Sequence, residues 1–293
     1  MKVCKAVIPA AGFGTRFLPA TKAQPKEMLN VVDKPLIQYS VEEAVDAGIE
    51  RIGIITSRGK SAIEDHFDIS PELEHFLEEK KKLDLLEEIR RISNLAEFCY
   101  IRQKQALGLG HAILMAESFA GSEPFSVLLP DDIFDCEVPC IKQLLKIHQK
   151  YKATVIVLMR VDEEGMKKYG IVKSKQISER VFKVEDMAEK PGPRKAFSNL
   201  AILGRYVFTP KIFKMIKHTS PDHRGEIQIT DAIRLLLKEE PVYGYLFEGI
   251  RYDCGDKLDY LQASLKLALK RPEFKEPLSE LIIKIANDVP KKI

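Results

Sequence analysis

A short apolar strand that runs directly into a loop of small residues is the feature that most constrains this chain. Residues 5–9 (KAVIP) are predicted as the strand, and four small residues follow it: Ala10, Ala11, Gly12 and Gly14. Small side chains let a ligand approach the backbone, whose free N–H groups can then bind phosphate oxygens. Three cations come next in the same segment: Arg16, Lys22 and Lys26. Cations gathered around a glycine loop indicate a phosphate-rich ligand, and a plain turn with solvated lysines is the less favoured interpretation.

Two better-known phosphate-binding motifs do not fit this chain. The pair Gly12 and Gly14 lacks the third glycine of the dinucleotide-binding fingerprint, because position 17 is Phe. The stretch from Gly53 to Lys60 resembles a P-loop, but five residues separate its glycines where the motif has four. Its first half is also predicted as a strand, which leaves too little loop to wrap a phosphate.

Composition and charge limit the class of protein. The 293 residues are 45% hydrophobic and 30% charged, as in an ordinary soluble globular protein. A net charge of only +3 argues against a strongly cationic nucleic-acid binder, so we expect no nucleic-acid partner. The chain begins with a strand instead of a signal peptide and has no apolar run of membrane-spanning length, so we expect a cytoplasmic protein without a membrane partner. The five cysteines lack the spacing of a zinc site.

Alternating strands and helices predict an α/β fold. The order strand, helix, strand within the first 56 residues is typical of a parallel sheet, and further strands are predicted at 98–102 and 125–129. Beyond residue 154 the strands follow one another more closely, which predicts an antiparallel excursion from the main sheet. Two late segments are expected to complete the sheet: 242–247 and 252–256.

Apolar spacing also predicts the main surface helices. A single amphipathic helix of about six turns is predicted over 70–92, with Ser70 as its cap. A second glycine pair, Gly108 and Gly110, precedes a helix predicted to start at residue 112 and offers bare backbone to an anionic or planar group. His111 is better explained as a capping or packing residue than as a catalytic one. Two terminal helices are predicted: 259–270 and 277–287.

Two acidic residues lie where α/β folds commonly place their chemistry. Asp131 and Asp132 follow directly after the strand predicted at 125–129, at its carboxyl end. Carboxylates suit Mg²⁺, which takes one or two of them together with substrate phosphates, although either acid could instead cap the next turn. Asp253, taken alone, is typical of a turn residue.

The cationic loop, the acid pair and the pair Glu189 and Lys190 together favour phosphoryl or nucleotidyl transfer. Catalysis in this class consists mainly of positioning and charge neutralisation. An attacking group that is already a phosphate anion needs cations around it more than a strong base. No Ser-His-Asp or Cys-His arrangement is apparent in the sequence.

Several motifs occur in an order that points to one family. The segment AAGFGTRFLPATKAQPKEML opens the series, and the most specific later segments are RGKSAIEDHFD and GEIQITDAI. The others are VDKPLIQYSVEEA, GLGHA, LLPDD, YGIV, EKP, SNLAILGRY and YDCGDKLDYL. From residue 5 to about 267, the chain resembles sugar-nucleotide pyrophosphorylases, and among them the bacterial UTP–glucose-1-phosphate uridylyltransferases. It departs from them at Asn30-Val31, where the family commonly has Pro-Ile.

This resemblance implies a Rossmann-like nucleotidyltransferase with a doubly wound, mostly parallel (mixed) central sheet flanked by helices and a small antiparallel sugar-binding excursion. The implied reaction moves a uridylyl group from UTP to α-D-glucose 1-phosphate with Mg²⁺, giving UDP-glucose and pyrophosphate. One domain would span 1–267, with a nucleotide half at about 1–135, a sugar-phosphate half at about 136–267 and a helical tail over 268–293. A homodimer or homotetramer is implied as well.

The resemblance also assigns roles to individual residues. The catalytic residues are expected to be Arg16, Lys26 and Lys190. The nucleotide is expected at Ala10, Ala11, Gly12 and Gly14, with its uracil at Gln103 and Gly108. The other substrate contacts are expected at Asp132, Gly170, Glu189 and Asn199. The metal is expected on Asp131 and Asp253. A thymidylyl- or adenylyltransferase and a non-catalytic sugar-nucleotide sensor remain as alternatives.

Overall fold

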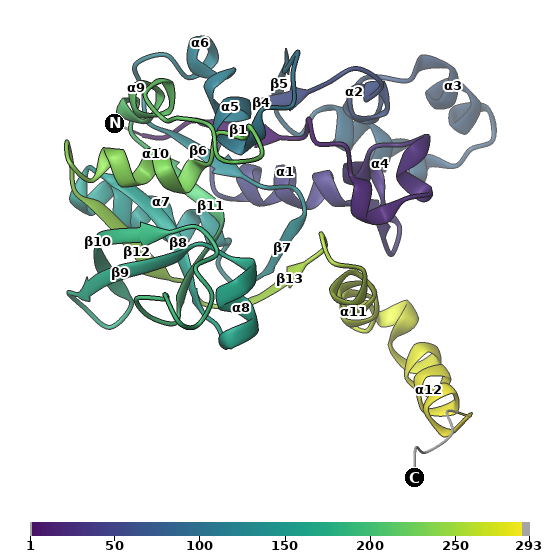
Figure 1. The fold of residues 1–293 in the computed structure, drawn as a ribbon. Helices are drawn as coiled ribbons and strands as arrows, with labels where there is room; N and C mark the ends of the chain where they lie inside the picture. Colours follow the sequence, from purple (N-terminus) through teal and green to yellow (C-terminus); the bar gives the residue numbers. More distant parts are fainter. Residues whose placement is uncertain (1, 289–293) are drawn as a thin grey trace.

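A nine-stranded mixed sheet forms the centre of the fold in the computed structural model, which describes residues 2–288 (Figure 1). From one edge to the other, its strands are β5 (Glu97–Arg102), β4 (Arg51–Thr56), β1 (Lys5–Pro9), β6 (Phe125–Leu128), β11 (Leu200–Phe208), β8 (Thr154–Arg160), β12 (Val242–Leu246), β10 (Val181–Ala188) and β9 (Ile171–Gln176). Strands β5, β4, β1 and β6 run parallel, while β11 is antiparallel to β6 and β8. At the far edge, β10 pairs antiparallel with β12 and β9. The predicted α/β class with a mixed sheet is confirmed.

Helices cover both faces of this sheet. Successive side chains on a strand point to opposite faces, so one strand can contribute to an apolar cluster on either side. On β1, Val7 packs with one apolar cluster, whereas Ala6 and Ile8 pack with the other. The helices of the first cluster are α5 (Gly108–Leu114), α6 (Glu117–Ala120), α9 (Lys211–Lys217) and α10 (Ile229–Leu236). Those of the second are α1 (Leu36–Asp46), α2 (Ser61–Phe67) and α7 (Cys140–Tyr151). The central strand β11 is buried at all nine residues, as expected for a strand covered on both sides.

A two-stranded ribbon beside the main sheet carries two of the predicted acids. β7 (Asp132–Asp135) pairs antiparallel with β13 (Ile250–Asp253), which places Asp132 opposite Asp253. A third apolar cluster joins this ribbon to β2 (Asn30–Val31) and α11 (Lys257–Ala268). The expectation that the segment around residue 252 completes the main sheet is wrong, because β13 pairs with β7 instead.

The helix predicted over 70–92 is in fact two helices, α3 (Pro71–Glu79) and α4 (Leu83–Ser93). Lys81, between them, has a left-handed backbone (φ 55°) that ends the first helix and turns the chain back. Each helix buries one leucine, Leu77 on α3 and Leu86 on α4, and a straight helix could not bring both onto the body of the protein. Ser70 stands at the predicted N-cap position, with Pro71 as the first helical residue, but its side chain makes no capping hydrogen bond.

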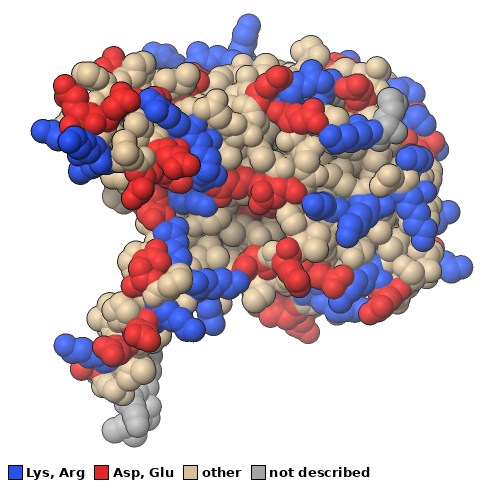
Figure 2. Space-filling view, turned by 180° about the vertical axis from the view of Figure 1, so that it is seen from behind, with Lys and Arg blue, Asp and Glu red and all other residues tan. Residues whose placement is uncertain are grey.

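The C-terminal helices lead away from the body of the protein. α12 (Pro272–Asp288) follows α11 and projects outward in Figures 1 and 2, and none of its residues is buried. The tail predicted over 268–293 is mainly helical as far as residue 288, and its part 289–293 lies outside the described residues. The predicted helix 277–287 lies within α12. In the described part of the chain, no helix combines the length and apolar character needed to cross a membrane.

Candidate active site

Most of the predicted site residues meet around two adjoining cavities. The larger, of about 510 Å³, is lined by seven of them: Arg16, Asp131, Asp132, Gly170, Glu189, Lys190 and Asp253. The smaller, of about 180 Å³, has three in its lining: Gly14, Arg16 and Lys26. Because Arg16 contributes to both linings, the cavities adjoin at this side chain. The fold thus brings the glycine loop, the strand-end acids and the sugar-phosphate candidates together.

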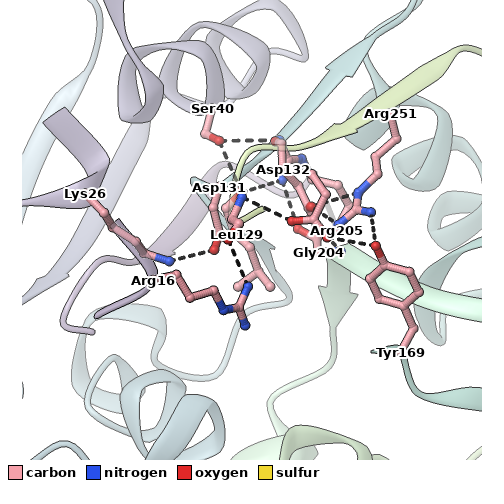
Figure 3. A network of polar contacts seen from close by, with 12 residues as sticks. Arg16, Lys26, Ser40, Leu129, Asp131, Asp132, Tyr169, Gly204, Arg205 and Arg251 are labelled. Atoms are coloured by element: carbon pink, nitrogen blue, oxygen red, sulfur yellow. Dashed lines mark hydrogen bonds and ion pairs between the residues drawn. The ribbon is translucent and has the colours of Figure 1, made fainter. Parts of the chain in front are cut away.

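An ion pair joins the glycine loop to the acid that follows β6. Lys26 lies in a short 3₁₀ helix, η3 (Lys26–Met28), preceded by Pro25, whose ring fixes the backbone (φ −59°) at the entry to this turn. Its Nζ lies 2.6 Å from Asp131 Oδ2, and Figure 3 shows Lys26 pointing at Asp131. Burial would raise the pKa of Asp131, but the charge of Lys26 outweighs burial and holds that pKa below its ordinary value. Asp131 is therefore ionised at neutral pH.

The second carboxylate of the larger cavity, Asp253, comes from the end of β13. The Tyr169 hydroxyl donates to its Oδ2 (2.7 Å), and the backbone N–H of Gly255 donates to its Oδ1 (3.1 Å). A Cβ atom on Gly255 would meet three charged atoms at 3.0–3.2 Å: Arg16 Nη1, Asp253 Oδ1 and Asp131 Oδ2. Both carboxylates and Arg16 therefore converge on a position that only glycine can occupy without displacing them.

Asp132 has both carboxylate oxygens engaged within the protein. Its Oδ2 accepts a hydrogen bond from the Gly204 backbone N–H (2.9 Å), and its Oδ1 accepts one from Arg251 Nε (2.8 Å). Arg251 also donates to the Tyr169 hydroxyl (2.6 Å), so it lies between Asp132 and Tyr169 in Figure 3. Asp132 is only 4% exposed, and burial raises its pKa against the opposing charge of Arg251. This geometry favours a positioning role for Asp132 over the substrate contact that the resemblance implied.

Arg205, a fully buried cation on β11, was missed by the sequence reasoning. Its Nε and Nη2 pair with Glu43 Oε2 at 3.0 and 2.8 Å. It also donates to the backbone carbonyls of Leu129 (2.9 Å) and Asp132 (2.8 Å), and so braces the turn that carries Asp131. The available signal was one charged residue inside an otherwise apolar strand, LAILGRYVF.

The sugar-phosphate candidates come from the second half of the chain. Glu189 Oε2 accepts a hydrogen bond from the Thr230 hydroxyl (3.1 Å), and its Oε1 lies 3.5 Å from Lys190 Nζ. Lys190 has a left-handed backbone (φ 45°), which is uncommon for a residue other than glycine and is often found at functional positions. Asn199 is exposed and does not line the cavity; its Oδ1 accepts a hydrogen bond from Arg160 (3.3 Å).

The nucleotide candidates lie after the carboxyl ends of β1 and β5. Ala10 and Ala11 are buried directly after β1, whereas Gly12 is exposed and has open space where a Cβ would stand. Gln103 follows β5, and Gly108 is five residues further along, at the start of α5. Since β1, β4 and β5 are parallel neighbours, these candidates share one edge of the sheet.

The helix predicted to start at residue 112 begins at Gly108 instead, so that prediction is wrong and both glycines lie in its first turn. The backbone N–H of Gly110 donates to the Ile227 carbonyl (2.9 Å), and a Cβ on Gly110 would lie 2.8 Å from that oxygen. Close packing against this neighbouring segment explains the glycines. His111, between them and the rest of the helix, is hydrogen-bonded to Gln103 (2.8 Å).

A buried lysine supports the glycine loop from within, and the sequence reasoning missed this role as well. Lys60 lies in the P-loop-like segment, whose first half is the strand β4, as predicted. Its Nζ donates to the Ala10 carbonyl (2.5 Å) and pairs with Glu27 Oε2 (2.7 Å). Lys60 is 7% exposed and Glu27 only 1%. The pair therefore links the end of β1 to the short helix that carries Lys26.

Comparison with known proteins gives the family. The model of the family described as nucleotidyl transferase matches residues 5–270. This chain belongs to the nucleotidyl transferase family. A UTP–glucose-1-phosphate uridylyltransferase of Bacillus subtilis (strain 168) is 53% identical to this nucleotidyl transferase over 277 residues, which cover 94% of this chain and 95% of that protein. The resemblance inferred from the motifs is confirmed.

Solved structures of similar proteins share the fold of this nucleotidyl transferase. A UDP-glucose pyrophosphorylase complexed with UDP-glucose has a TM-score of 0.84 and 45% identity, over 92% of this chain and all (100%) of that one. The UTP-bound UGPase from Acinetobacter baumannii has a TM-score of 0.89 and 41% identity, over 96% of this chain and 99% of that one. The nucleotidyltransferase fold expected from the motifs is therefore confirmed.

Proposed function

We propose that this nucleotidyl transferase moves the uridylyl group of UTP onto α-D-glucose 1-phosphate, producing UDP-glucose and pyrophosphate. The observation that carries the proposal is the convergence of Arg16, Asp131 and Asp253 on Gly255, where the two cavities adjoin. This arrangement offers a cation to phosphate oxygens beside two carboxylates. The similarity to a UTP–glucose-1-phosphate uridylyltransferase over 94% of the chain supports the choice of nucleotide and sugar.

The proposed reaction is a single in-line displacement. A phosphate oxygen of glucose 1-phosphate attacks the α-phosphorus of UTP, and the bond from that phosphorus to the bridging oxygen breaks as pyrophosphate leaves. Both reactants are anions, so the main catalytic requirement is positive charge. Arg16 and Lys26 supply it to the triphosphate, with Lys26 assisting the departure of pyrophosphate, and Lys190 supplies it to the sugar phosphate.

The remaining roles follow the two halves of the chain. The nucleotide binds along Ala10, Ala11, Gly12 and Gly14, with the uracil at Gln103 and Gly108. The glucose phosphate binds at Gly170 and Glu189, with Glu189 on the sugar hydroxyls; Asn199, which does not line the cavity, remains a prediction from the sequence. This assignment places the nucleotide residues within about 1–135 and the sugar-phosphate residues within about 136–267, the domain division that we propose.

We propose Mg²⁺ as the ion held by Asp131 and Asp253. Their oxygens converge on Gly255, and residues 2–288 contain no cluster of three or more His, Cys, Asp or Glu side chains that could hold a metal. Mg²⁺ commonly takes one or two protein carboxylates and completes its coordination with phosphate oxygens and water, so this donor set fits the ion. When bound, the ion neutralises charge on the phosphates.

We also propose that the chain forms a homodimer or homotetramer. No residue of α12 is buried within the protomer, and three of its apolar side chains are at least half exposed: Leu281 (50%), Ile283 (63%) and Ile285 (54%). In proteins most of the stability of a helix comes from packing its apolar face against a partner. A second copy of the chain would supply that partner, and light scattering of the full chain measures the oligomeric state.

Release of pyrophosphate tests the proposed activity directly. The protein is incubated with Mg²⁺, glucose 1-phosphate and one of UTP, dTTP, ATP, CTP or GTP, beside the variants Asp131→Ala and Asp135→Ala. Asp135 is the matched control, because it pairs with Lys270 and does not line the cavity. We expect release selective for UTP, lost in Asp131→Ala and retained in Asp135→Ala.

The other outcomes separate the alternatives. Release that favours dTTP or ATP would preserve the mechanism and contradict the choice of base. No release with any nucleotide, from folded protein that binds UDP-glucose, would indicate a non-catalytic sugar-nucleotide sensor. A uridylyl-enzyme trapped from labelled UTP in the absence of sugar phosphate would overturn the single displacement.

A further inference from the structure

The side chain of Gln103 is held at its amide nitrogen by two acceptors. Its Nε2 lies 2.8 Å from His111 Nδ1 and 3.4 Å from the Gly108 carbonyl oxygen. Gln103 is 5% exposed, so this amide has little freedom to turn. The backbone carbonyl of Gly108 and the side chain of His111, both in α5, therefore reach the same atom of the amide.

These two contacts fix which end of the amide points outward. A carbonyl oxygen only accepts hydrogen bonds, so the Gln103 atom facing Gly108 is the nitrogen, and the same nitrogen donates to His111 Nδ1. The imidazole then carries its proton on Nε2, and burial lowers the pKa of His111, which favours this neutral form. No hydrogen bond from residues 2–288 reaches Gln103 Oε1, which leaves a carbonyl oxygen free to accept one.

The position of Gln103 relative to the glycine loop suits a base. The Gln103 backbone N–H donates to Thr56 O, and the Ala10 backbone N–H donates to Ile55 O, both at 2.8 Å. Gln103 and Ala10 therefore flank the end of β4, one on each side of this strand. Two strand spacings, about 10 Å, separate them. A nucleotide with its phosphates at the loop can reach Gln103 with its base over such a distance.

We propose that His111 is a positioning residue that sets the base selectivity of the enzyme by holding the Gln103 carbonyl oxygen toward the base. This inference rests on the proposed function. Uracil presents an N3–H donor, which Oε1 can accept, whereas N3 of cytosine is an acceptor and meets Oε1 with a lone pair. A site arranged to pair with one donor rejects the analogue that lacks it. Without His111, only the longer contact with the Gly108 carbonyl (3.4 Å) favours this orientation, so the amide turns over more readily and offers its nitrogen to cytosine.

The test compares variants that remove or keep the acceptor at position 111. His111→Leu and His111→Met remove it, while His111→Asn keeps an acceptor oxygen near the place of Nδ1. His66→Leu is the control, because His66 contacts a buried glutamine, Gln38 on α1 (Nε2 to Oε1, 2.9 Å), to which the proposed function assigns no contact with the nucleotide. The quantity measured is kcat/KM for UTP divided by kcat/KM for CTP, together with KM for glucose 1-phosphate.

We expect the UTP-to-CTP ratio to fall about 10-fold or more in His111→Leu and His111→Met, with KM for glucose 1-phosphate changed less than about 2-fold. His111→Asn and His66→Leu should keep the ratio within about 3-fold of the unaltered enzyme. An unchanged ratio in both Leu and Met variants, or an equal loss with the two nucleotides, would overturn the inference. Absence of activity in the unaltered protein would instead refute the proposed function. His111 is only partly buried, and two different truncations guard against one that fails to fold.

Discussion

The buried pair of Lys60 and Glu27 offers a sharp test of how the glycine loop is held. Glu27→Gln keeps the shape of the side chain but leaves the Lys60 ammonium buried, with the Ala10 carbonyl as its remaining close partner. Removing one member of a buried ion pair typically costs about 3–5 kcal/mol, because the other charge loses its compensation. With an unfolding entropy of about 2.1 cal/mol/K per residue, a chain of 293 residues should lose about 5–8 °C in Tm.

A second variant separates the charge effect from the loss of packing. Lys60→Met/Glu27→Gln removes both charges, and the cost should fall to about 1–2 kcal/mol, since replacing a buried pair is often close to neutral. The control Glu50→Gln breaks the exposed pair with Lys2 and should leave the urea midpoint and Tm nearly unchanged, because solvent screens this pair. Urea and thermal unfolding measure all three. A single variant as stable as the control, or a double variant less stable than the single one, would refute this reasoning.

Three further predictions concern the site and its support. Tyr169→Phe removes a hydrogen bond to Asp253 and should raise the Mg²⁺ concentration for half-maximal activity by about 10-fold, measured by Mg²⁺ titration; an unchanged titration would contradict the proposed metal ligand. Gly108→Ala should lower the free energy of unfolding in urea by about 1–3 kcal/mol more than Gly121→Ala does. Both glycines have positive φ, but only at Gly108 would the added Cβ lie 3.0 Å from neighbouring backbone. Lys190→Met should raise KM for glucose 1-phosphate by about 10-fold or more and leave KM for UTP nearly unchanged; the reverse pattern would place Lys190 on the nucleotide.

The sequence predicted those features whose causes are local. The strand at Lys5–Pro9 and its glycine loop were recognisable because apolar residues, small residues and cations follow one another within a short segment. The strand-end location of Asp131 followed in the same way from the apolar run before it. The helix 70–92 failed for the opposite reason, since its break at Lys81 depends on where Leu77 and Leu86 find buried surface.

The supporting charges of the site were not predictable from local patterns. Lys60 acquires its role from Ala10 and Glu27, and Arg205 acquires its role from Glu43, 162 residues earlier in the chain. A lysine after a strand and an arginine within one are compatible with many surroundings until the tertiary fold supplies their partners. The residues proposed to contact phosphate were therefore visible in the sequence, while those that hold them in place became visible only in the structure.

The pairing of β7 with β13 has a consequence for synthesis of the protein. Asp132 and Arg251 are 119 residues apart, so a nascent chain that has emerged only as far as β7 has this acid without the guanidinium that compensates its burial. Domains generally fold as units during translation. The parallel strands β5, β4, β1 and β6 come from the first 128 residues, but Asp253 reaches the site only with the last strand. Messages truncated before residue 250 should therefore yield chains that lack a complete catalytic centre, however much of the parallel sheet they form.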